Sequence, residues 1–320
     1  MPKSLSGGGT LYNKDMAKVV PCRLCGADET EGVFVVDGLA LVKCSRCGLV
    51  YVNPQPTPSE REFCNLRIYR SREYKEQYFR DRRALERRFR KKLKQIERYN
   101  DRGRLLDIGC SYGFFLRVAK VRGWDVYGVE ANPDAARYAS EIWGLKVVQG
   151  RFEETKWPVG FFDVVTMWDV LEHMPDPTET LRTVRNILKR GGILAIQCPN
   201  IDSLVARRKQ ERWNWLTPGD HLYYFSPHTL SLLLEKAGYS VLSLYTWEPT
   251  RYFVDSLFSF EKHKGIVFVI YRKSILRGLR SIFSFLFAPV QCLEKIVDRG
   301  ALIVAFARRE YDTSGCNSEA

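Results

Sequence analysis

The sequence predicts an α/β fold in which a mostly parallel sheet carries helices on both faces, preceded by a small cysteine-containing module. Two observations predict this arrangement. After Gly103, short apolar runs alternate with segments of helical periodicity, which is typical of a covered parallel sheet. Before Gly103, two Cys-x2-Cys pairs lie in a stretch of short apolar runs and turns. A chain of 320 residues is long enough for one large domain and a smaller unit.

The chain divides by composition into five parts. We expect disordered ends at 1–18 and 311–320, a cysteine module at 19–58, a basic helical linker or lid at 59–101 and an α/β domain at 102–310. The Pro-rich stretch NPQPTPSE marks the end of the cysteine module. The first residues are rich in Gly and Ser and lack the apolar run of a signal peptide, so the expected location is the cytoplasm.

The elements of the α/β domain follow from periodicity and from turn residues. We predict strands at 104–109, 125–130, 146–150, 162–167, 193–199, 240–247 and 301–309. We predict helices at 114–123, 133–144, 178–192 and 226–238. In the last of these helices, Ser226 and Pro227 are suited to the beginning and Gly238 to the end.

Positive charge is concentrated between the two units. Residues 67–104 contain 16 Lys and Arg against 6 Asp and Glu, so most of the net charge of +13 lies there. Such a segment can attract phosphate groups of nucleotide sugars, RNA or lipids. A solvated helical face is the alternative interpretation.

A second basic and apolar segment forms an insertion at 250–298, before the last strand. Its longest uncharged run, Ser281–Leu293, is too short to span a bilayer, which needs about 20 residues. Basic residues beside an apolar run favour a peripheral membrane contact through 265–293. Packing on the core and contact between subunits are the alternatives.

The four paired cysteines have the spacing of a zinc site. Two Cys-x2-Cys loops can direct four thiolates at one tetrahedral ion, and a glycine follows each pair. The predicted ligands of a structural zinc ion in a zinc-ribbon-like module are Cys22, Cys25, Cys44 and Cys47. A redox dithiol is the alternative for one pair, but two matched pairs favour the metal.

A glycine-containing turn follows the first strand of the α/β domain. It reads Asp107-x-Gly109-x3-Gly113, which differs from the GxGxxG spacing of dinucleotide-binding proteins. Glycines at these positions let the backbone pass close to a ligand. Glu130 ends the next strand, where a carboxylate accepts hydrogen bonds from ribose hydroxyls. This pattern predicts nucleoside binding.

The segments LLDIGCSYGFFL, VYGVEANP, FDVVTMWDVLEHMPDP and GGILAIQCPN resemble the class I S-adenosylmethionine-dependent methyltransferases. Together with HLYYFSPHTLSLLLEKAGY, the resemblance covers about 102–248 and implies a Rossmann-like sheet. It implies that S-adenosylmethionine is held at its methionine end by Asp107, Gly109, Cys110 and Gly113. It implies that Glu130 binds the ribose with Asn132 nearby, that Phe152 and Trp168 flank the adenine, and that Asp169 faces the sulfonium.

Methyl transfer to a hydroxyl or a carbon acid requires a proton acceptor near the sulfonium. The chain contains four histidines, and His221 is the first candidate for the base, in WNWLTPGDHLYYFS. This stretch is similar to the acidic-His-Leu-x-Tyr segment of sugar C-methyltransferases, which places Asp220 and His221 on the acidic residue and the base. His173 in DVLEHMPDP is the second candidate. Both histidines can instead serve only as hydrogen-bond partners.

The expected function is methyl transfer, by O-methylation, to a small-molecule or glycan acceptor such as a sugar, a lipid-linked sugar or an isoprenoid-type metabolite. An RNA methyltransferase is one alternative, since a zinc module and a basic helix can bind RNA. The region Gln197-Cys198-Pro199-Asn200 lacks the Asn-Pro-Pro-Tyr/Phe motif of amino methylation, which disfavours nucleic acid as a partner. A non-catalytic docking module is a second alternative, and the glycine spacing disfavours NAD-dependent oxidoreduction.

Overall fold

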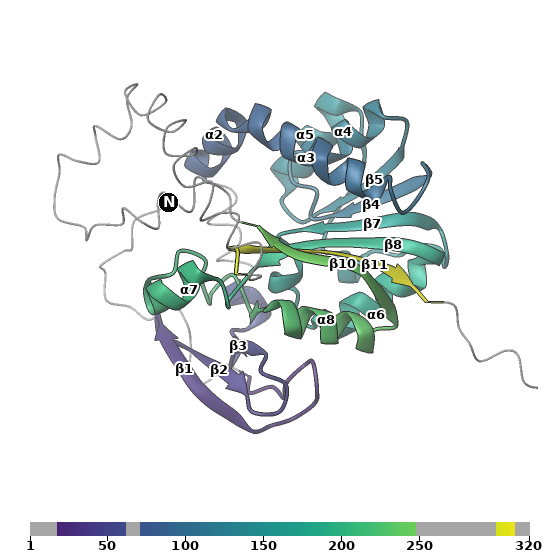
Figure 1. The fold of residues 1–320 in the computed structure, drawn as a ribbon. Helices are drawn as coiled ribbons and strands as arrows, with labels where there is room; N and C mark the ends of the chain where they lie inside the picture. Colours follow the sequence, from purple (N-terminus) through teal and green to yellow (C-terminus); the bar gives the residue numbers. More distant parts are fainter. Residues whose placement is uncertain (1–17, 62–70, 248–298, 311–320) are drawn as a thin grey trace, which may run out of the picture.

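The computed structural model describes residues 18–61, 71–247 and 299–310 (Figure 1). Its strands are β1 (Thr30–Val36), β2 (Leu39–Cys44), β3 (Val50–Val52), β4 (Arg104–Ile108), β5 (Asp125–Glu130), β6 (Lys146–Gln149), β7 (Phe162–Trp168), β8 (Leu188–Pro199), β9 (Tyr223–Tyr224), β10 (Tyr239–Trp247) and β11 (Leu302–Arg309). Its α-helices are α2 (Arg72–Arg80), α3 (Arg82–Ile96), α4 (Phe114–Val121), α5 (Pro133–Trp143), α6 (Pro177–Ile187), α7 (Leu204–Lys209) and α8 (Pro227–Lys236). Short 3-10 turns are η1 (Phe152–Glu154), η2 (Leu171–His173) and η3 (Gln210–Arg212).

The larger sheet has seven strands in the order β10-β11-β8-β7-β4-β5-β6. Strands β4 to β8 run parallel, while β11 is antiparallel to both of its neighbours. Because β4 lies between β5 and β7, Asp107 is in register with Gly128 on one side and Thr166 on the other. The carboxyl ends of the central strands therefore meet at one edge of the sheet, which is where open α/β sheets bind ligands.

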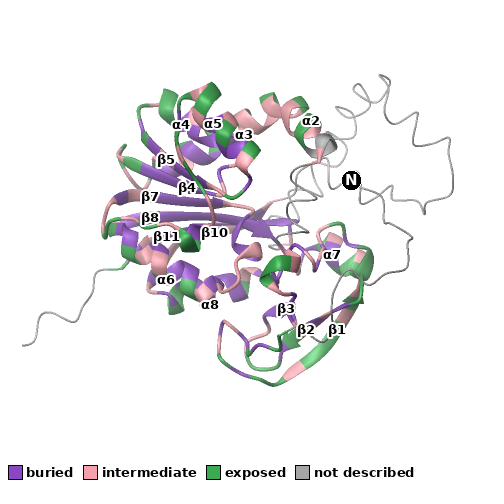
Figure 2. Cartoon of the chain, turned by 180° about the vertical axis from the view of Figure 1, so that it is seen from behind, coloured by how far each residue is buried: buried purple, intermediate pink, exposed green. Residues whose placement is uncertain are grey.

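Helices cover both faces of this sheet, and the predicted Rossmann-like fold class is confirmed. Helices α3, α4 and α5 lie on one face, and α6 and α8 lie on the other (Figure 1). Seen from behind, the central strands are mostly buried between these two layers (Figure 2). Each face has its own apolar cluster, with Phe115 and Leu116 on the α4 side and Leu181 and Leu233 on the α6 side.

Local sequence explains where most helices begin and end. Helix α5 begins at Pro133 because the Asn132 side chain accepts hydrogen bonds from the first turn, and it ends at left-handed Gly144. Helix α8 has a capping box in which Ser226 and Thr229 each bond to the backbone of the other.

Helix α6 differs from the prediction, which extended it to Gly192. It ends at Ile187, and β8 begins at Leu188. Leu188 has an extended backbone (ψ 143°), is fully buried and is paired with Phe162 of β7. Pairing with the neighbouring strand thus overrides the local helical preference of this segment.

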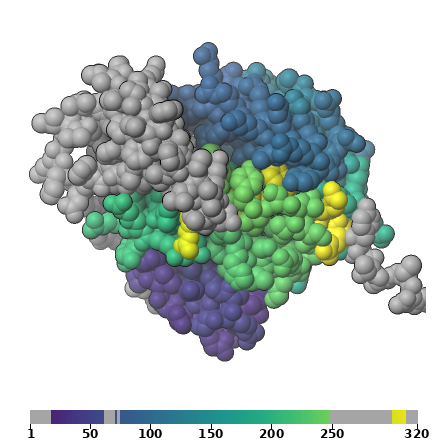
Figure 3. Space-filling view, viewed as in Figure 1, coloured from purple at the N-terminus to yellow at the C-terminus, as the bar shows by residue number. Residues whose placement is uncertain are grey.

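The smaller sheet is antiparallel and has the order β1-β2-β3-β9. Three of its strands come from the cysteine module, but β9 comes from the long segment between β8 and α8. Val50 pairs with Tyr224, and Tyr51 pairs with Tyr223. In the space-filling view the purple N-terminal residues are therefore continuous with the rest of the molecule (Figure 3).

Side-chain contacts join the cysteine module to α6 and α8 as well. Lys236 donates from Nζ to the carbonyl of Leu24 at 2.8 Å, and Arg23 lies 3.3 Å from the Asp176 carboxylate. Gln55 of the module donates from Nε2 to the Tyr223 hydroxyl at 3.0 Å, and that hydroxyl donates to the Pro175 carbonyl. The module thus packs directly on the segment that carries η2 and α6.

Several sequence predictions concern residues outside the described ranges. They are the insertion at 250–298, the membrane contact through 265–293, the tail at 311–320 and nearly all of 1–18. Within the described part of the chain, no helix is both long enough and apolar enough to cross a membrane.

Candidate active site

The glycine turn after β4 packs closely against neighbouring side chains of the protein. Gly109 and Gly113 have positive φ values of 70° and 75°. A Cβ atom on Gly109 would lie 2.5 Å from a methyl carbon of Val170, and one on Gly113 would lie 2.6 Å from Leu145. The amides of Gly109 and Cys110 both donate to the carbonyl of Val129, which ties the turn to β5. Both glycines are therefore required by backbone angle and by space.

Glu130 organises the same turn from the end of β5. Its carboxylate accepts a hydrogen bond from the Ser111 amide and another from the Asn132 amide, each at 2.7 Å. Burial raises the pKa of Glu130, while these backbone N–H groups act in the opposite direction. A half-buried carboxylate between a glycine turn and a helix beginning is suited to binding the hydroxyls of a ribose.

Asp107 lies at the centre of this edge of the sheet. Its Oδ1 atom accepts a hydrogen bond of 2.6 Å from the Thr166 hydroxyl on β7. Burial raises the pKa of the Asp107 carboxyl to about 7, against the lowering effects of the Thr166 hydroxyl and the Lys92 ammonium. Burying a carboxylate costs desolvation free energy, and a strongly shifted pKa at the carboxyl ends of parallel strands is typical of a functional site.

Asp169 follows β7 and is held in an unusual backbone conformation. Its φ of 58° is positive, and its amide donates to the Gln197 carbonyl. The Gln197 amide group in turn lies 2.9 Å from both carboxylate oxygens of Asp169. Strand β8 thus orients the Asp169 carboxylate, which the resemblance places near the sulfonium.

Lys92 of α3 is a site residue that the sequence analysis missed. It is buried, and its Nζ lies 4.0 Å from the ring centroid of Trp168. Burial lowers the pKa of Lys92 to about 8, while the carboxylates of Asp169 and Asp107 act in the opposite direction. Its position in the apolar stripe of α3, with Phe89 and Leu93 at helical spacing, is a sequence pattern that could have identified it.

The remaining residues of the predicted cofactor site separate into different environments. Phe152 is buried in the cluster on the α6 side, whereas Trp168 packs edge-on against Phe115 on the α4 side. Among the described ring contacts, none joins Phe152 to Trp168. Cys110 is buried, and its sulfur occupies the space that a side chain at position 128 would need.

The structure brings the two candidate bases, His173 and His221, together and places the Asp220 carboxylate beside His173. Their imidazole centroids are 4.6 Å apart. Asp220, which precedes His221 in the chain, lies with Oδ1 3.1 Å from Nδ1 of His173. Nδ1 of His221 lies 2.9 Å from the Trp215 carbonyl. The backbone turn between Trp215 and His221 directs the acidic side chain to the other histidine.

These environments shift the pKa values of the two imidazoles in opposite directions. Burial would lower the pKa of His173, but the Asp220 carboxylate outweighs it and raises the pKa to about 9. Burial and the neighbouring His173 lower the pKa of His221 to about 4. Glu172, which the sequence analysis did not single out, is fully buried beside them, and burial raises its pKa to about 8.

Comparison with known proteins identifies the family. The sequence matches the family described as "Methyltransferase domain" over residues 77–244, which is more than half of the chain. The chain belongs to the methyltransferase domain family. The predicted enzyme class, a methyltransferase, is confirmed by this membership.

Curated relatives of this methyltransferase include ubiquinone biosynthesis O-methyltransferases. The protein from Cereibacter sphaeroides is 34% identical over 146 residues, which is 42% of this chain and 59% of that protein. The protein from Xanthomonas axonopodis is 30% identical over 162 residues, 46% of this chain and 68% of that protein. The match to the Cereibacter protein thus covers less than two thirds of its length.

Solved structures support the fold assignment of the methyltransferase. A SAM-dependent methyltransferase from Thermotoga maritima superposes with a TM-score of 0.50 at 19% identity, over 76% of this chain and 98% of that one. A chain from the complex of the Haloferax volcanii Trm112 methyltransferase activator with a methyltransferase also gives 0.50, at 15% identity, over 74% and 96%. At these identities the similarity concerns the fold alone.

The four paired cysteines of the methyltransferase converge as the sequence predicts. Sγ of Cys22 is 3.5 Å from that of Cys47, and Sγ of Cys25 is 3.4 Å from that of Cys44. Each pair forms the same turn, in which the following glycine has a φ of 77° and donates its N–H to the first cysteine's carbonyl. Four sulfurs 2.3 Å from a tetrahedral zinc ion would be about 3.8 Å apart, so the group fits such an ion.

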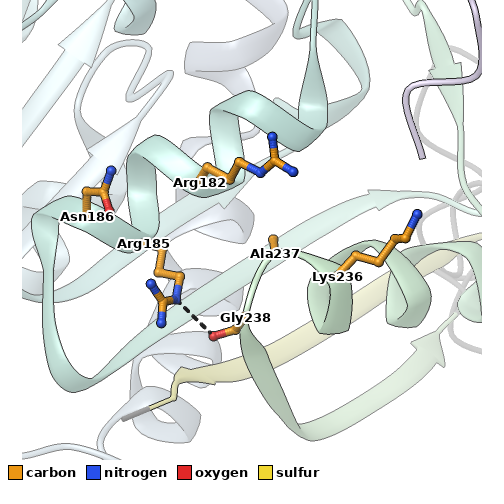
Figure 4. Close-up of a pocket in the computed structure, with 6 residues that line it drawn as sticks. All are labelled: Arg182, Arg185, Asn186, Lys236, Ala237 and Gly238. Carbon is orange, nitrogen blue, oxygen red and sulfur yellow. Dashed lines mark hydrogen bonds between the residues drawn. The ribbon is translucent and has the colours of Figure 1, made fainter. Parts of the chain in front are cut away.

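A separate surface pocket of about 380 Å³ lies between α6 and α8 (Figure 4). It is lined by Arg182, Arg185, Asn186, Lys236, Ala237 and Gly238. Arg185 donates from Nε to the Gly238 carbonyl across it. None of the predicted site residues lines this pocket, so it is distinct from the candidate active site.

Proposed function

We propose that the protein transfers the methyl group of S-adenosylmethionine to a hydroxyl oxygen of a small-molecule acceptor. The observation that carries the proposal is the joint geometry of the β4 turn and Glu130. Two glycines with positive φ form a tight turn, and the Glu130 carboxylate accepts a hydrogen bond from the Ser111 amide within that turn. This arrangement suits a nucleoside cofactor at the carboxyl ends of parallel strands.

The charged residues at this edge suit the two ends of the cofactor. Glu130 can accept hydrogen bonds from the ribose hydroxyls. Asp107 and Asp169 offer negative charge to the ammonium and sulfonium groups, and Lys92 offers positive charge to the carboxylate of the methionine part. The chemistry supplied by S-adenosylmethionine is an electrophilic methyl carbon on a positively charged sulfur. The protein has to align the acceptor with it and exclude water.

The acceptor side of the site is formed by the segments after β7 and before β9. Glu172, His173 and His221 lie there, and the charge of Asp169 adds to burial in raising the pKa of Glu172. The expected role of His221 as general base is poorly supported, because a group with a pKa near 4 takes a proton from a hydroxyl only weakly. His173 is already paired with Asp220 and protonated near neutral pH.

O-methylation is supported by the relatives, which are named as O-methyltransferases of ubiquinone biosynthesis. For this chain we propose an acceptor that carries a free hydroxyl group, such as a sugar, a lipid-linked sugar or an isoprenoid-type metabolite. We further propose that the four cysteines hold a structural zinc ion. With four thiolates bound, that ion keeps no open position for substrate.

Calorimetric titration with S-adenosylmethionine, and separately with NAD, tests the cofactor. We expect saturable binding of S-adenosylmethionine, no binding of NAD, and loss of binding in Asp107→Ala. Asp202→Ala is a matched control, because this carboxylate is half exposed and contacts Arg207. Absence of S-adenosylmethionine binding by the folded wild-type protein would refute the proposal. Formation of S-adenosylhomocysteine with panels of hydroxylated acceptors then identifies the substrate.

A further inference from the structure

Three buried side chains on the acceptor side of the site form a compact group of potential metal ligands. Glu172 and His173 belong to η2, and His221 precedes β9. One ligand atom from each lies within 4.8 Å of the others. The two segments are joined by the backbone, because the Leu222 amide donates to the Glu172 carbonyl at 2.8 Å. Main-chain structure thus holds the three side chains together.

Both imidazoles are oriented as metal-binding histidines usually are. Nδ1 of His173 lies 3.0 Å from the Asp220 carbonyl oxygen and 3.1 Å from its carboxylate. Nδ1 of His221 lies 2.9 Å from the Trp215 carbonyl. Oxygen acceptors require an N–H at each Nδ1, so the nitrogen that is left to bind an ion is Nε2 in both rings. At His173 the ion displaces the Nε2 proton that the ring holds near neutral pH, because only a deprotonated nitrogen can be a ligand. A carbonyl or carboxylate behind the imidazole is the usual support of a ligating histidine.

Glu172 provides the second and independent indication. It is 1% exposed, and within the described part of the chain neither of its carboxylate oxygens has a hydrogen-bond partner. A buried carboxylate without a hydrogen bond is costly, and such groups in folded proteins are usually paired or coordinate a metal. With Asp220 beside His173, the group contains two carboxylates, whose charge a divalent ion would balance.

We propose that Glu172, His173 and His221 bind a divalent transition-metal ion such as Zn²⁺, separate from the cysteine site. Two histidines and one carboxylate form a ligand set that zinc and related ions accept, and it leaves positions open for an oxygen ligand. The four-cysteine site has the opposite character, since its ligands are all thiolates. Ligands about 2.1 Å from one ion would be roughly 3.4 Å apart, so binding requires the three side chains to draw together slightly.

This inference rests on the proposed function and assigns a role to the group within it. Such an ion would lower the pKa of an acceptor hydroxyl bound to it, so that the hydroxyl would release its proton to bulk water as the acceptor binds and before the site excludes water. The oxygen then forms a bond to the methyl carbon, the bond between that carbon and sulfur breaks, and sulfur keeps the electron pair. In this scheme no histidine has to act as the base, which is consistent with both imidazoles serving as metal ligands.

Metal content distinguishes the two sites. After equilibration with zinc and removal of excess ion, we expect about two zinc ions per wild-type chain and about one in Glu172→Gln and in His221→Ala. His228→Ala is the matched control, since His228 is exposed, and it should keep both ions. Asp220→Asn should weaken the second site by about 10–100-fold without removing a ligand. Retention of both ions by Glu172→Gln and His221→Ala would overturn the assignment.

Cobalt(II) provides a readout that does not depend on the variants folding. Titration of metal-free wild-type protein should show one equivalent with thiolate-to-cobalt charge-transfer bands and a further equivalent without them. A single equivalent would also overturn the proposal. These results are separable from the cofactor test. If the protein bound S-adenosylmethionine but held only the cysteine-bound metal, the proposed function would stand and the proposed second metal site would be refuted.

Discussion

The ammonium group of Lys92 on α3 lies over the indole ring of Trp168 at the end of β7, with Nζ 4.0 Å from the ring centroid. The contact joins the basic helical segment before the α/β domain to the edge of the sheet that carries Asp107 and Asp169. Burying the charged form of a lysine costs desolvation free energy, so a buried lysine is expected where its positive charge has a role. This segment therefore contributes directly to the candidate site.

Replacement of Lys92 by Met should weaken S-adenosylmethionine binding by about 10-fold or more, because a charged hydrogen-bonding group contributes roughly 1.5–3 kcal/mol. Titration calorimetry measures the change. Lys91→Met is the control, since Lys91 is exposed on the same helix and should bind the cofactor normally. Equal affinities for the two variants would show that Lys92 does not contact the cofactor.

Replacement of Glu130 by Gln should weaken cofactor binding by roughly 10–100-fold. The substituted amide keeps one oxygen acceptor, but it cannot serve the Ser111 and Asn132 amides as well as two ribose hydroxyls. Affinity for S-adenosylhomocysteine, which has the same ribose, should fall to a similar extent. Glu141→Gln on the exposed face of α5 is the control, and an unchanged Kd for Glu130→Gln would exclude the ribose contact.

Replacement of Asp107 by Asn should abolish cofactor binding and stabilise the cofactor-free protein at high pH. The folded-state pKa of about 7 is above the ordinary value of 3.8, so the native state holds a proton that the unfolded state has released. Stability is therefore lost as pH rises from about 4 to 7. Each unit of pKa shift corresponds to about 1.4 kcal/mol, so the effect amounts to a few kcal/mol.

Thermal unfolding of the cofactor-free proteins at pH 5 and pH 8 checks this prediction. The Tm advantage of Asp107→Asn over wild type should be larger at pH 8. The asparagine can still accept the Thr166 hydrogen bond, so that contact is preserved. An advantage that is the same at both pH values would contradict the assigned environment of Asp107.

Replacement of Cys44 by Ser should release zinc and lower the Tm, because the free energy of binding a structural metal contributes to folding. The effect should extend to methyl transfer. Val52 of β3 donates its amide to the Leu222 carbonyl, and the Leu222 amide donates to Glu172, so the cysteine module supports the acceptor side of the site. Metal analysis, unfolding and turnover are measured together.

Cys316→Ser serves as the control for this change, since Cys316 belongs to neither pair. It should retain zinc and full turnover. If Cys44→Ser lost its zinc while methyl transfer stayed unchanged, the supporting role of β3 would be disproved.

Local sequence determined most of the helices and strands, and the residue types at the edge of the sheet where we propose that the cofactor binds. Strand and helix periodicity, the Asn132 and Ser226 caps, the turn from Gly109 to Gly113 and the cysteine spacing all act over a few residues. Such patterns depend on backbone angles and hydrogen bonds within one turn. They could therefore be interpreted without knowing what packs against them.

Tertiary structure alone decided which distant residues meet. The pairing of β3 with Tyr223 and Tyr224, the burial of Lys92 against Trp168 and the partnership of Asp220 with His173 each join residues far apart in the chain. Their positions depend on how whole layers pack and on which neighbouring strand is available. No local pattern encodes that choice, because the free energy comes from burial and from contacts that exist only after the chain has folded.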